Sequence, residues 1–585
     1  MRIRFAVVLC VGVIGSRALA APTPVALDPV KPVVSCASLA QSSFDKAVNA
    51  EVKIDSAIEG PIEGSAYCQI KGSIAPKIGF ELRLPVAGWT QRFLQLGCGG
   101  LCGVLNIRVE HADDCRPVVE HSVALASTDM GHRGTMMGDG SFGSDNQARI
   151  DFAYRGVHLT ALASKALIRA YYGRAPKYAY FAGCSDGGRE ALMEAQRFPE
   201  DFDGISAGAP AMNFLVQNTF YHAWMYAANH RPDGSAILTA VKLPALHAAA
   251  LASCDALDGL KDGQITDPRA CHFNPVDAVC KTTVNDNSCL SAEEAAVANK
   301  LYQGPRDAAG HRFTIGGPQV GSELSWAGVF VPDSARGEVM SGGAALGTLQ
   351  YLAFEQNPGA NYNLKDFRFD QATFRRLKAM HPLYDATDTD LSKFHARGGK
   401  LLLWHGWSDP HISPINTIAY YHAVRSQIGD VQTDGFLRLF LIPGMYHCMG
   451  GEGTGSFDAL TPLMSWVESG AAPDRIIAAH ADMPLSMGPP PDSKPGAGGP
   501  PDRGPPDGGP PVNLPPPRVT RTRPVFPYPQ VAHYRGSGSV DEAASFGAAA
   551  PAIPDPAAYL WEGASFMTSD FHKSCEVAGG KLTCQ

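Results

Sequence analysis

The segment from Tyr178 to Phe198 constrains the fold of this chain more than any other. Tyr178 to Ala182 is a continuous apolar run, a glycine-rich stretch of residues 183–188 (GCSDGG) follows it, and residues 190–198 have helical spacing. A serine in a strand–turn–helix, with glycines two residues before and after it, is the pattern of a nucleophile elbow. Ser185 is therefore a candidate nucleophile. The competing interpretation is a plain glycine-rich turn.

Short apolar runs alternate with helical patterns along much of the chain. Strands are expected within residues 80–97 and at 122–127, 178–182, 400–406 and 438–444, and helices at 160–172 and 190–198. Continuous apolar strands separated by helices are typical of a largely parallel sheet covered on both faces. The pattern predicts an α/β fold.

Two segments depart from this pattern. Residues 212–391 are rich in loops and lie between strands of one expected sheet, which predicts an inserted lid domain. Residues 488–517 are rich in proline and glycine and are expected to form an exposed loop. The expected organisation is a catalytic domain in two parts, 21–211 and 392–585, with the lid of 212–391 between them.

The first twenty residues have the features of a signal peptide. Arg2 and Arg4 precede an apolar run over residues 5–15, and residues 18–20 (ALA) form an A-x-A cleavage site. No later stretch has eighteen apolar residues, so no membrane insertion is expected. The net charge of −8 does not favour nucleic-acid binding. The expected location is secreted or periplasmic.

The cysteine count fits that location. The chain has 14 cysteines, and cleavage after residue 20 would remove Cys10 and leave an odd number. In an oxidising compartment most of them should be paired, with at least one free. A zinc site is the less favoured alternative, because no close Cys/His quartet is present. Disulfides are expected within the lid and near the C-terminus, and their candidate cysteines are Cys254, Cys271, Cys280, Cys289, Cys575 and Cys584.

An elbow serine requires a base and an orienting acid further along the chain, in the order Ser, Asp, His. Asp409 follows the strand at 400–406, and His447 follows the strand at 438–444. Both loops should open at the sheet edge that carries the elbow. His405 is a rival base, but it precedes the acid and lies at a strand end, so it is interpreted as structural.

Three segments resemble the tannase/feruloyl esterase family: residues 180–211, 405–414 (HGWSDPHISP) and 443–451 (PGMYHCMGG). The resemblance implies an α/β-hydrolase fold with a large inserted lid. It implies Ser185 as nucleophile, His447 as general base and then acid, and Asp409 as the residue that orients His447.

The resemblance also implies a disulfide and an oxyanion hole. The family's cysteine pair corresponds to Cys184 and Cys448, and the free thiol would then be one of Cys36, Cys68, Cys98, Cys102 and Cys115. The oxyanion hole would use the backbone N–H of Asp186 and one from the turn at residues 97–103 (GCGGLCG), with Gly100 preferred and Gly99 possible. The other interpretation of that turn is simple chain reversal.

An acidic, glycine-containing loop follows Cys254. Its three carboxylates repel one another unless solvent or a cation neutralises them, and its spacing is not that of an EF-hand. It resembles the family's calcium site in the lid. The implied ligands are the side chains of Asp255, Asp258 and Asp262 and the carbonyls of Leu260 and Gln264. A solvated acidic turn is the alternative.

The sequence offers only candidates for the pocket that would bind the acid part of the substrate. Trp326, Phe330 and Tyr302 are candidates for ring stacking but are better explained as lid core, and Arg312 or Arg336 could pair a substrate carboxylate. The expected function is hydrolysis of small aromatic esters, such as feruloyl, galloyl or terephthaloyl esters, through an acyl-enzyme. A broad aryl or alkyl carboxylesterase is one alternative, and a non-catalytic protein that binds phenolics or carbohydrate is another. The oligomeric state and the exact ester stay open.

Overall fold

The computed structural model describes residues 23–134, 139–281, 286–482, 518–554 and 573–584. The expected signal peptide at 1–20 and the proline-rich stretch at 488–517 lie outside these ranges.

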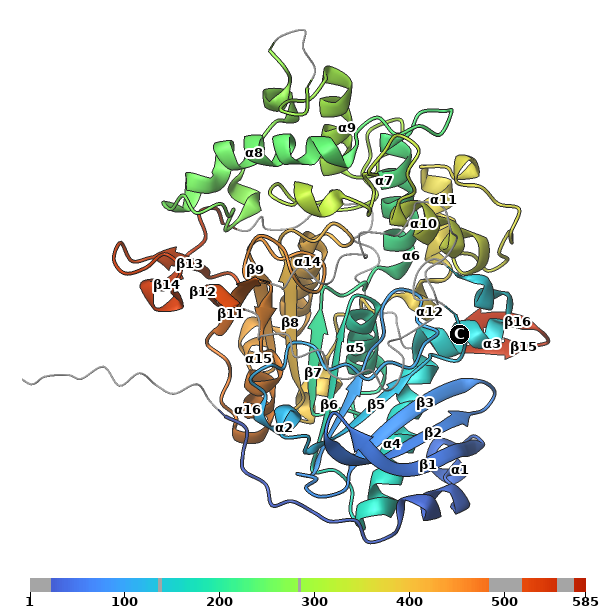
Figure 1. Cartoon of the computed structure of the whole chain (residues 1–585). Coiled ribbons are helices and arrows are strands. Elements are labelled where there is room, and N and C mark those ends of the chain that lie inside the picture. Colours follow the sequence, from blue (N-terminus) through green and yellow to red (C-terminus); the bar gives the residue numbers. More distant parts are fainter. Residues whose placement is uncertain (1–22, 135–138, 282–285, 483–517, 555–572, 585) are drawn as a thin grey trace, which may run out of the picture.

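A nine-stranded sheet forms the centre of the molecule (Figure 1). Its strand order is β1-β2-β3-β5-β4-β6-β7-β8-β9, and the six strands from β5 to β9 in this order pair in parallel. Three antiparallel strands extend one edge. The bounds are β1 Val52–Ile62, β2 Ser65–Ile74, β3 Ile78–Pro85, β4 Arg92–Leu96, β5 Val123–Thr128, β6 Tyr178–Cys184, β7 Gly204–Gly208, β8 Lys400–Gly406 and β9 Leu437–Ile442.

The parallel part agrees with the sequence pattern, because β5, β6, β8 and β9 occupy the expected apolar runs to within a few residues. The antiparallel hairpin of β1 and β2 was not among the expected strands. In its first strand only Val52 is fully buried, and partly buried side chains alternate with exposed ones over much of the rest, which suits a strand with only one covered face.

Helices cover both faces of the sheet. The bounds of the covering helices are α4 Gly156–Tyr172, α5 Asp186–Arg197, α14 Pro414–Ile428 and α16 Leu460–Ser469. Successive residues of a strand point to opposite faces. Phe181 accordingly belongs to the core that contains α5, whereas Tyr180 belongs to a second core that contains residues of α16. The architecture is that of the α/β-hydrolase fold, as expected.

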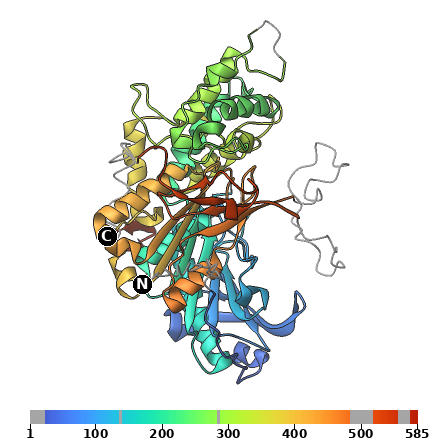
Figure 2. The same ribbon diagram turned by 90° about the vertical axis from the view of Figure 1, so that its left-hand side faces the viewer.

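Between β7 and β8 the chain forms a helical segment with no named strand in its described residues. Figures 1 and 2 show the green part of this segment above the sheet. A separate apolar core inside it contains Leu243, Trp326 and Phe330. Its helices are α6 Phe214–Val216, α7 His222–Asn229, α8 Leu243–Cys254, α9 Ala292–Gln303, α10 Met340–Tyr351, α11 Gln371–Lys378, α12 His381–Tyr384 and α13 Ser392–Ala396, with a π-helical turn at Gln217–Tyr221. We refer to this segment as the lid.

The remaining elements are short. They are α1 Asp45–Val48, α2 Arg116–Val119, α3 Asn146–Ile150, α15 Asp430–Asp434, β10 Ser456–Phe457, β11 Ile476–Asp482, β12 Arg518–Val525, β13 Val531–Tyr534, β14 Phe546–Ala549, β15 Cys575–Ala578 and β16 Lys581–Cys584. No helix in the described part of the chain is long and apolar enough to cross a bilayer.

Six disulfides connect the described cysteines, and the eight that the sequence assigns to bridges are all paired. The pairs are Cys36–Cys68, Cys98–Cys102, Cys184–Cys448, Cys254–Cys271, Cys280–Cys289 and Cys575–Cys584. The free thiol among the described residues is Cys115. Burial raises the pKa of this thiol to about 12, so it is protonated and unreactive at neutral pH.

Candidate active site

Ser185 lies at the sharp turn between β6 and α5, as the elbow pattern predicts. Its backbone has φ 66° and ψ −120°, a conformation that non-glycine residues rarely adopt. The flanking glycines are required by close backbone approaches. A Cβ on Gly183 would lie 2.5 Å from the carbonyl oxygen of Gly187, and one on Gly188 would lie 2.3 Å from that of Gly208. The turn therefore presents the serine side chain away from the sheet.

Asp409 and His447 meet on the loops that follow β8 and β9. His447 Nδ1 lies 2.7 Å from Asp409 Oδ2. The other carboxylate oxygen, Oδ1, accepts hydrogen bonds from the backbone N–H groups of His411 (2.8 Å) and Ile412 (3.0 Å). Asp409 is fully buried. Burial alone would raise the pKa of Asp409, but His447 and His405 hold it below its ordinary value, so the group is a carboxylate.

His405, the rival base, also contacts Asp409. Its Nε2 lies 3.0 Å from Asp409 Oδ2, and its Nδ1 lies 2.8 Å from Thr417 Oγ1. Since both ring nitrogens are engaged in a fully buried position, His405 supports the acid and is not one of the residues that line the active-site cavity. The four donors around Asp409 fix its orientation.

The Cys184–Cys448 disulfide connects the elbow to the histidine loop. Its Cα atoms are 5.9 Å apart, although 264 residues separate the two cysteines in sequence. One cysteine immediately precedes Ser185 and the other immediately follows His447. The bridge thus holds the two loops next to each other, and Ser185 and His447 line the same cavity.

This cavity has a volume of about 780 Å³ and lies between the sheet edge and the lid. Gly99, Gly100 and Asp186, the three residues predicted for the oxyanion hole, line it. The lid contributes Gln217, Asn218, His222, Val339, Met340, Gly343, Ala344 and Thr348. A cavity of this size with a largely apolar wall and a few polar groups is suited to a small organic ligand.

Three further histidines, His111, His222 and His411, line the cavity, and sequence reasoning did not single them out. His411 has its ring centroid 4.5 Å from that of His447, and His222 Nδ1 lies 2.9 Å from Ser341 Oγ. Burial, with a smaller effect from His447, holds the pKa of His411 well below its ordinary value and lowers that of His222 to about 3. Both are neutral imidazoles. His411 could have been identified from the sequence, because it lies only two residues after the candidate acid Asp409.

The ring-stacking candidates in the lid do not line the cavity. Trp326 and Phe330 are fully buried in the lid core, and the Tyr302 hydroxyl donates a 2.5 Å hydrogen bond to Glu323. Their interpretation as lid core is therefore confirmed.

The two arginine candidates, Arg312 and Arg336, also lie outside the cavity wall. The charged residues that line it are Arg108, Glu110 and Glu338, together with Asp186 of the elbow. Arg108 comes from the segment after the glycine-rich turn rather than from the lid. Its Nε lies 3.8 Å from Glu110 Oε1. Sequence reasoning did not identify Arg108 as a cavity residue, because nothing in the local pattern shows that the segment around it faces the cavity.

The acidic loop of the lid begins at the C-terminal end of α8. Asp258, Leu260, Asp262 and Gln264 line a small cavity of about 40 Å³, whereas Asp255 accepts hydrogen bonds from the backbone N–H groups of Asp262 and Gly263. Burial raises the pKa of Asp258, and the charges of Asp262 and Asp255 add to that effect. Oxygen donors crowded around a small cavity are the donor set that calcium prefers.

An arginine already neutralises part of this cluster. Arg523 Nη2, on β12, lies 2.6 Å from Asp262 Oδ2, and both side chains are buried. The loop is therefore attached to the catalytic part of the chain by an ion pair that the sequence pattern did not reveal. Asp258, Leu260 and Gln264 also line the cavity, and Asp258 accepts hydrogen bonds from the backbone N–H of Leu260 (2.9 Å) and the hydroxyl of Thr266 (2.5 Å).

Comparison with known proteins agrees with this architecture. The sequence model described as tannase and feruloyl esterase matches residues 63–549. The chain is 35% identical to an uncharacterized esterase of Xanthomonas campestris over 82% of its own length and 84% of that protein. It is 32% identical to a mono(2-hydroxyethyl) terephthalate hydrolase of Piscinibacter sakaiensis, over 83% and 85%. Among solved structures, feruloyl esterase B from Aspergillus oryzae superimposes with a TM-score of 0.71 at 25% identity, covering 88% of this chain and 100% of that one.

Proposed function

Because the chain belongs to the tannase and feruloyl esterase family of carboxylic ester hydrolases, we propose that it cleaves esters of aromatic carboxylic acids through an acyl-enzyme on Ser185. The observation that carries the proposal is the hydrogen bond between His447, which lines the same cavity as Ser185, and the buried Asp409 behind it. Such a pair activates a serine that is weakly nucleophilic on its own.

The protonation pattern follows from the hydrogen bonds. Asp409 is a carboxylate, so it can only accept hydrogen bonds. Its partner, Nδ1 of His447, must therefore be the donor and carry the proton of the neutral ring. Nε2 of His447 is then free to take the proton of the Ser185 hydroxyl as the oxygen attacks the ester carbonyl. The negative charge that develops on the carbonyl oxygen is stabilised by the backbone N–H groups of Gly100 and Asp186.

Two bond-breaking steps complete the cycle. The tetrahedral intermediate collapses, His447 gives its proton to the leaving alcohol, and the acyl group stays on Ser185. Water then attacks this acyl-enzyme while His447 takes its proton, and as the bond to Ser185 breaks His447 returns that proton to the Ser185 oxygen and the aromatic acid leaves. Asp409 stays ionised throughout and stabilises the imidazolium form of His447.

The lining of the cavity is suited to an aromatic acyl group. Its wall combines Val339, Met340 and Ala344 of the lid with the neutral imidazoles of His222 and His411, which can exchange hydrogen bonds with ring hydroxyls. The names of the relatives, feruloyl esterase and mono(2-hydroxyethyl) terephthalate hydrolase, point to the same substrate class. The test compares kcat/KM for methyl ferulate, methyl gallate, chlorogenate and mono(2-hydroxyethyl) terephthalate with that for p-nitrophenyl acetate. A rate constant for p-nitrophenyl acetate that exceeds all four would favour a broad carboxylesterase.

The nucleophile is tested directly. Ser185→Ala or His447→Ala should lower kcat by roughly 10⁴–10⁶, the range seen when members of such a triad are removed. A serine-directed phosphonate should give one adduct, located by mass spectrometry on Ser185. An adduct on another residue, or an active Ser185→Ala variant, would contradict the acyl-enzyme and exclude this assignment.

We further propose that the lid loop binds one structural calcium ion. The residues that would hold it are Asp255, Asp258 and Asp262 through their carboxylates and Leu260 and Gln264 through carbonyls. Support comes from the cavity that four of them line and from the raised pKa of Asp258. Bound calcium would neutralise the carboxylates, and its loop is distinct from the serine site, so it takes no part in the ester chemistry.

We also propose that the protein is exported. Six disulfides fit an oxidising compartment, and residues 1–20 have the composition of a leader. N-terminal sequencing of protein recovered outside the cytoplasm should begin at Ala21. Accumulation of the full-length chain in the cytoplasm would argue against export.

A further inference from the structure

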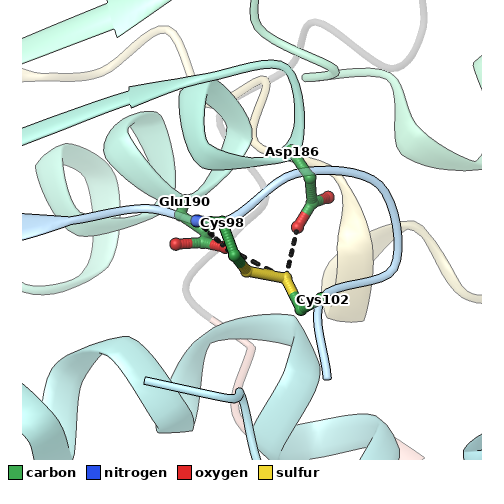
Figure 3. Close-up of side chains that lie close together, drawn as sticks. All are labelled: Cys98, Cys102, Asp186 and Glu190. Atoms are coloured by element: carbon green, nitrogen blue, oxygen red, sulfur yellow. Dashed lines mark hydrogen bonds between the residues drawn. A yellow bond between two sulfur atoms is a disulfide. The ribbon is translucent and has the colours of Figure 1, made fainter. Parts of the chain in front are cut away.

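The glycine-rich turn after β4 is closed by its own disulfide. Cys98 and Cys102 are bridged around Gly99, Gly100 and Leu101, and the N–H of Cys102 donates a 3.0 Å hydrogen bond to the carbonyl of Gly99. Figure 3 shows this disulfide next to Asp186 and Glu190 of α5. Gly99 and Gly100 line the active-site cavity, so the covalent ring encloses the backbone that faces the substrate.

Two carboxyl groups of α5 point at this disulfide (Figure 3). Glu190 Oε1 lies 2.8 Å from Cys98 Sγ and 3.4 Å from Cys102 Sγ, and Asp186 Oδ2 lies 3.5 Å from Cys102 Sγ. Glu190 and Asp186 are only 1% and 2% exposed. Although these four side chains are close enough to surround a metal ion, the disulfide removes the two thiolates that a metal would need.

The contacts show which of the two carboxyl groups carries a proton. A disulfide sulfur has no hydrogen, so a hydrogen bond between Glu190 and Cys98 Sγ requires the proton on Glu190. Asp186 is the anion, because the buried guanidinium of Arg189 contacts both of its oxygens at 2.7 and 3.0 Å. Burial, reinforced by the charge of Asp186, raises the pKa of Glu190 well above its ordinary value. Glu190 is therefore neutral and adds no negative charge beneath the cavity.

The turn also lies directly on the first turn of α5. A Cβ on Gly97 would lie 2.6 Å from the Cα of Gly187, and a Cβ on Gly187 would lie 3.0 Å from the carbonyl oxygen of Cys98. Glu190 Oε1 is also 3.4 Å from the backbone nitrogen of Cys98. Backbone packing and one carboxyl group thus fix the turn to the helix, and the disulfide restricts the conformation of the turn itself.

We propose that the Cys98–Cys102 disulfide and the carboxyl group of Glu190 are positioning groups that hold the backbone N–H of Gly100 in the oxyanion hole. This inference rests on the proposed function, since it takes Gly100 and Asp186 as the oxyanion donors. Such donors accelerate a reaction because they are oriented before the charge develops. Glycine-rich backbone is the most conformationally free kind, so without the bridge the turn would sample many orientations.

The test replaces each positioning group separately. Cys98→Ala/Cys102→Ala should lower kcat by about 10- to 100-fold, less than the roughly 10²–10³-fold cost of removing an oxyanion donor outright, while KM changes by less than about threefold. Affinity for an aryl boronic acid, which places an oxygen in the oxyanion hole, should fall with kcat/KM. Glu190→Leu should act in the same direction, and Glu190→Gln, which keeps a neutral hydrogen-bond donor, should stay within about threefold of wild type.

A second local disulfide provides the matched control. Cys575→Ala/Cys584→Ala removes a bridge whose cysteines are nine residues apart in a C-terminal hairpin, and kcat should be unchanged. The inference is overturned if the Cys98/Cys102 variant keeps its kcat, or if its kcat falls while boronate affinity does not. If that variant does not fold, the comparison of Glu190→Leu with Glu190→Gln decides, and equal kcat values overturn the role of Glu190. An active Ser185→Ala variant would instead refute the proposed function.

Discussion

Asp409→Asn is the substitution whose outcome the structure specifies most fully. Asp409 Oδ1 accepts hydrogen bonds from two backbone N–H groups, those of His411 and Ile412. In the variant, the amide oxygen must stay at that position, because an NH₂ group there would face two donors. The amide NH₂ group therefore replaces Oδ2, which in the wild type lies 2.7 Å from His447 Nδ1 and 3.0 Å from His405 Nε2.

An NH₂ group at this position donates, so His447 Nδ1 and His405 Nε2 must both accept a hydrogen bond from it. His405 can do so, because its Nδ1 would then donate to the hydroxyl of Thr417, which can act as donor or acceptor. His447 would instead carry its proton on Nε2, the nitrogen that must be free to receive the proton of Ser185. The same tautomer effect in serine proteases lowers kcat by about 10⁴, and a loss of that size corresponds to about 5.4 kcal/mol in the barrier.

The assay is kcat on the best substrate of the panel, together with the melting temperature. Asp409→Asn should lower the melting temperature only slightly, since both histidines and both backbone N–H groups retain a partner and only the Ile412 carbonyl, 3.1 Å from His405 Nε2, loses its donor. Asp409→Ala is the contrasting variant: it leaves the two backbone N–H groups unpaired and should lose both kcat and stability. A variant Asp409→Asn that keeps more than a tenth of the wild-type kcat would refute the tautomer argument. The kcat of the double variant Ser185→Ala/Asp409→Asn should be no lower than that of Ser185→Ala alone.

Three further predictions concern the disulfide at the site, the lid loop and a buried acid. Cys184→Ala/Cys448→Ala opens a loop of 264 residues, for which chain entropy gives an upper limit of roughly 5–6 kcal/mol, and should lower kcat more than it raises KM. A linked peptide from unreduced protein that joins Cys184 to another cysteine would contradict the structure. Elemental analysis should find one calcium ion per chain, and a chelator should lower the melting temperature; metal-free protein with unchanged melting would exclude the ion. Burial raises the pKa of Asp129 to about 6, so the folded state holds a proton that the unfolded state releases near pH 4, and this contribution to stability is lost as pH rises from about 4 to 6. Asp129→Asn should therefore raise the melting temperature more at pH 7 than at pH 4, and an equal gain at both would show that the carboxyl is not protonated in the folded state.

The sequence by itself determined the elements of the parallel sheet and the elbow. Both depend on short-range chemistry: apolar runs of strand length predict β6, β8 and β9, and glycines beside Ser185 permit a turn that other residues would block. The chain order of Ser185, Asp409 and His447 could be read in the same way, because each residue follows a recognisable strand.

Tertiary structure alone decided which groups surround these residues. The cavity wall formed by His222 and Arg108, and the ion pair between Arg523 of β12 and Asp262 of the lid loop, join segments far apart in the chain that no local pattern relates. Side-chain periodicity shows which face of an element is buried, but not what packs against that face. The protonation states of Glu190 and Asp409 depend on burial and on neighbouring charges, and both of these arise only when the chain has folded.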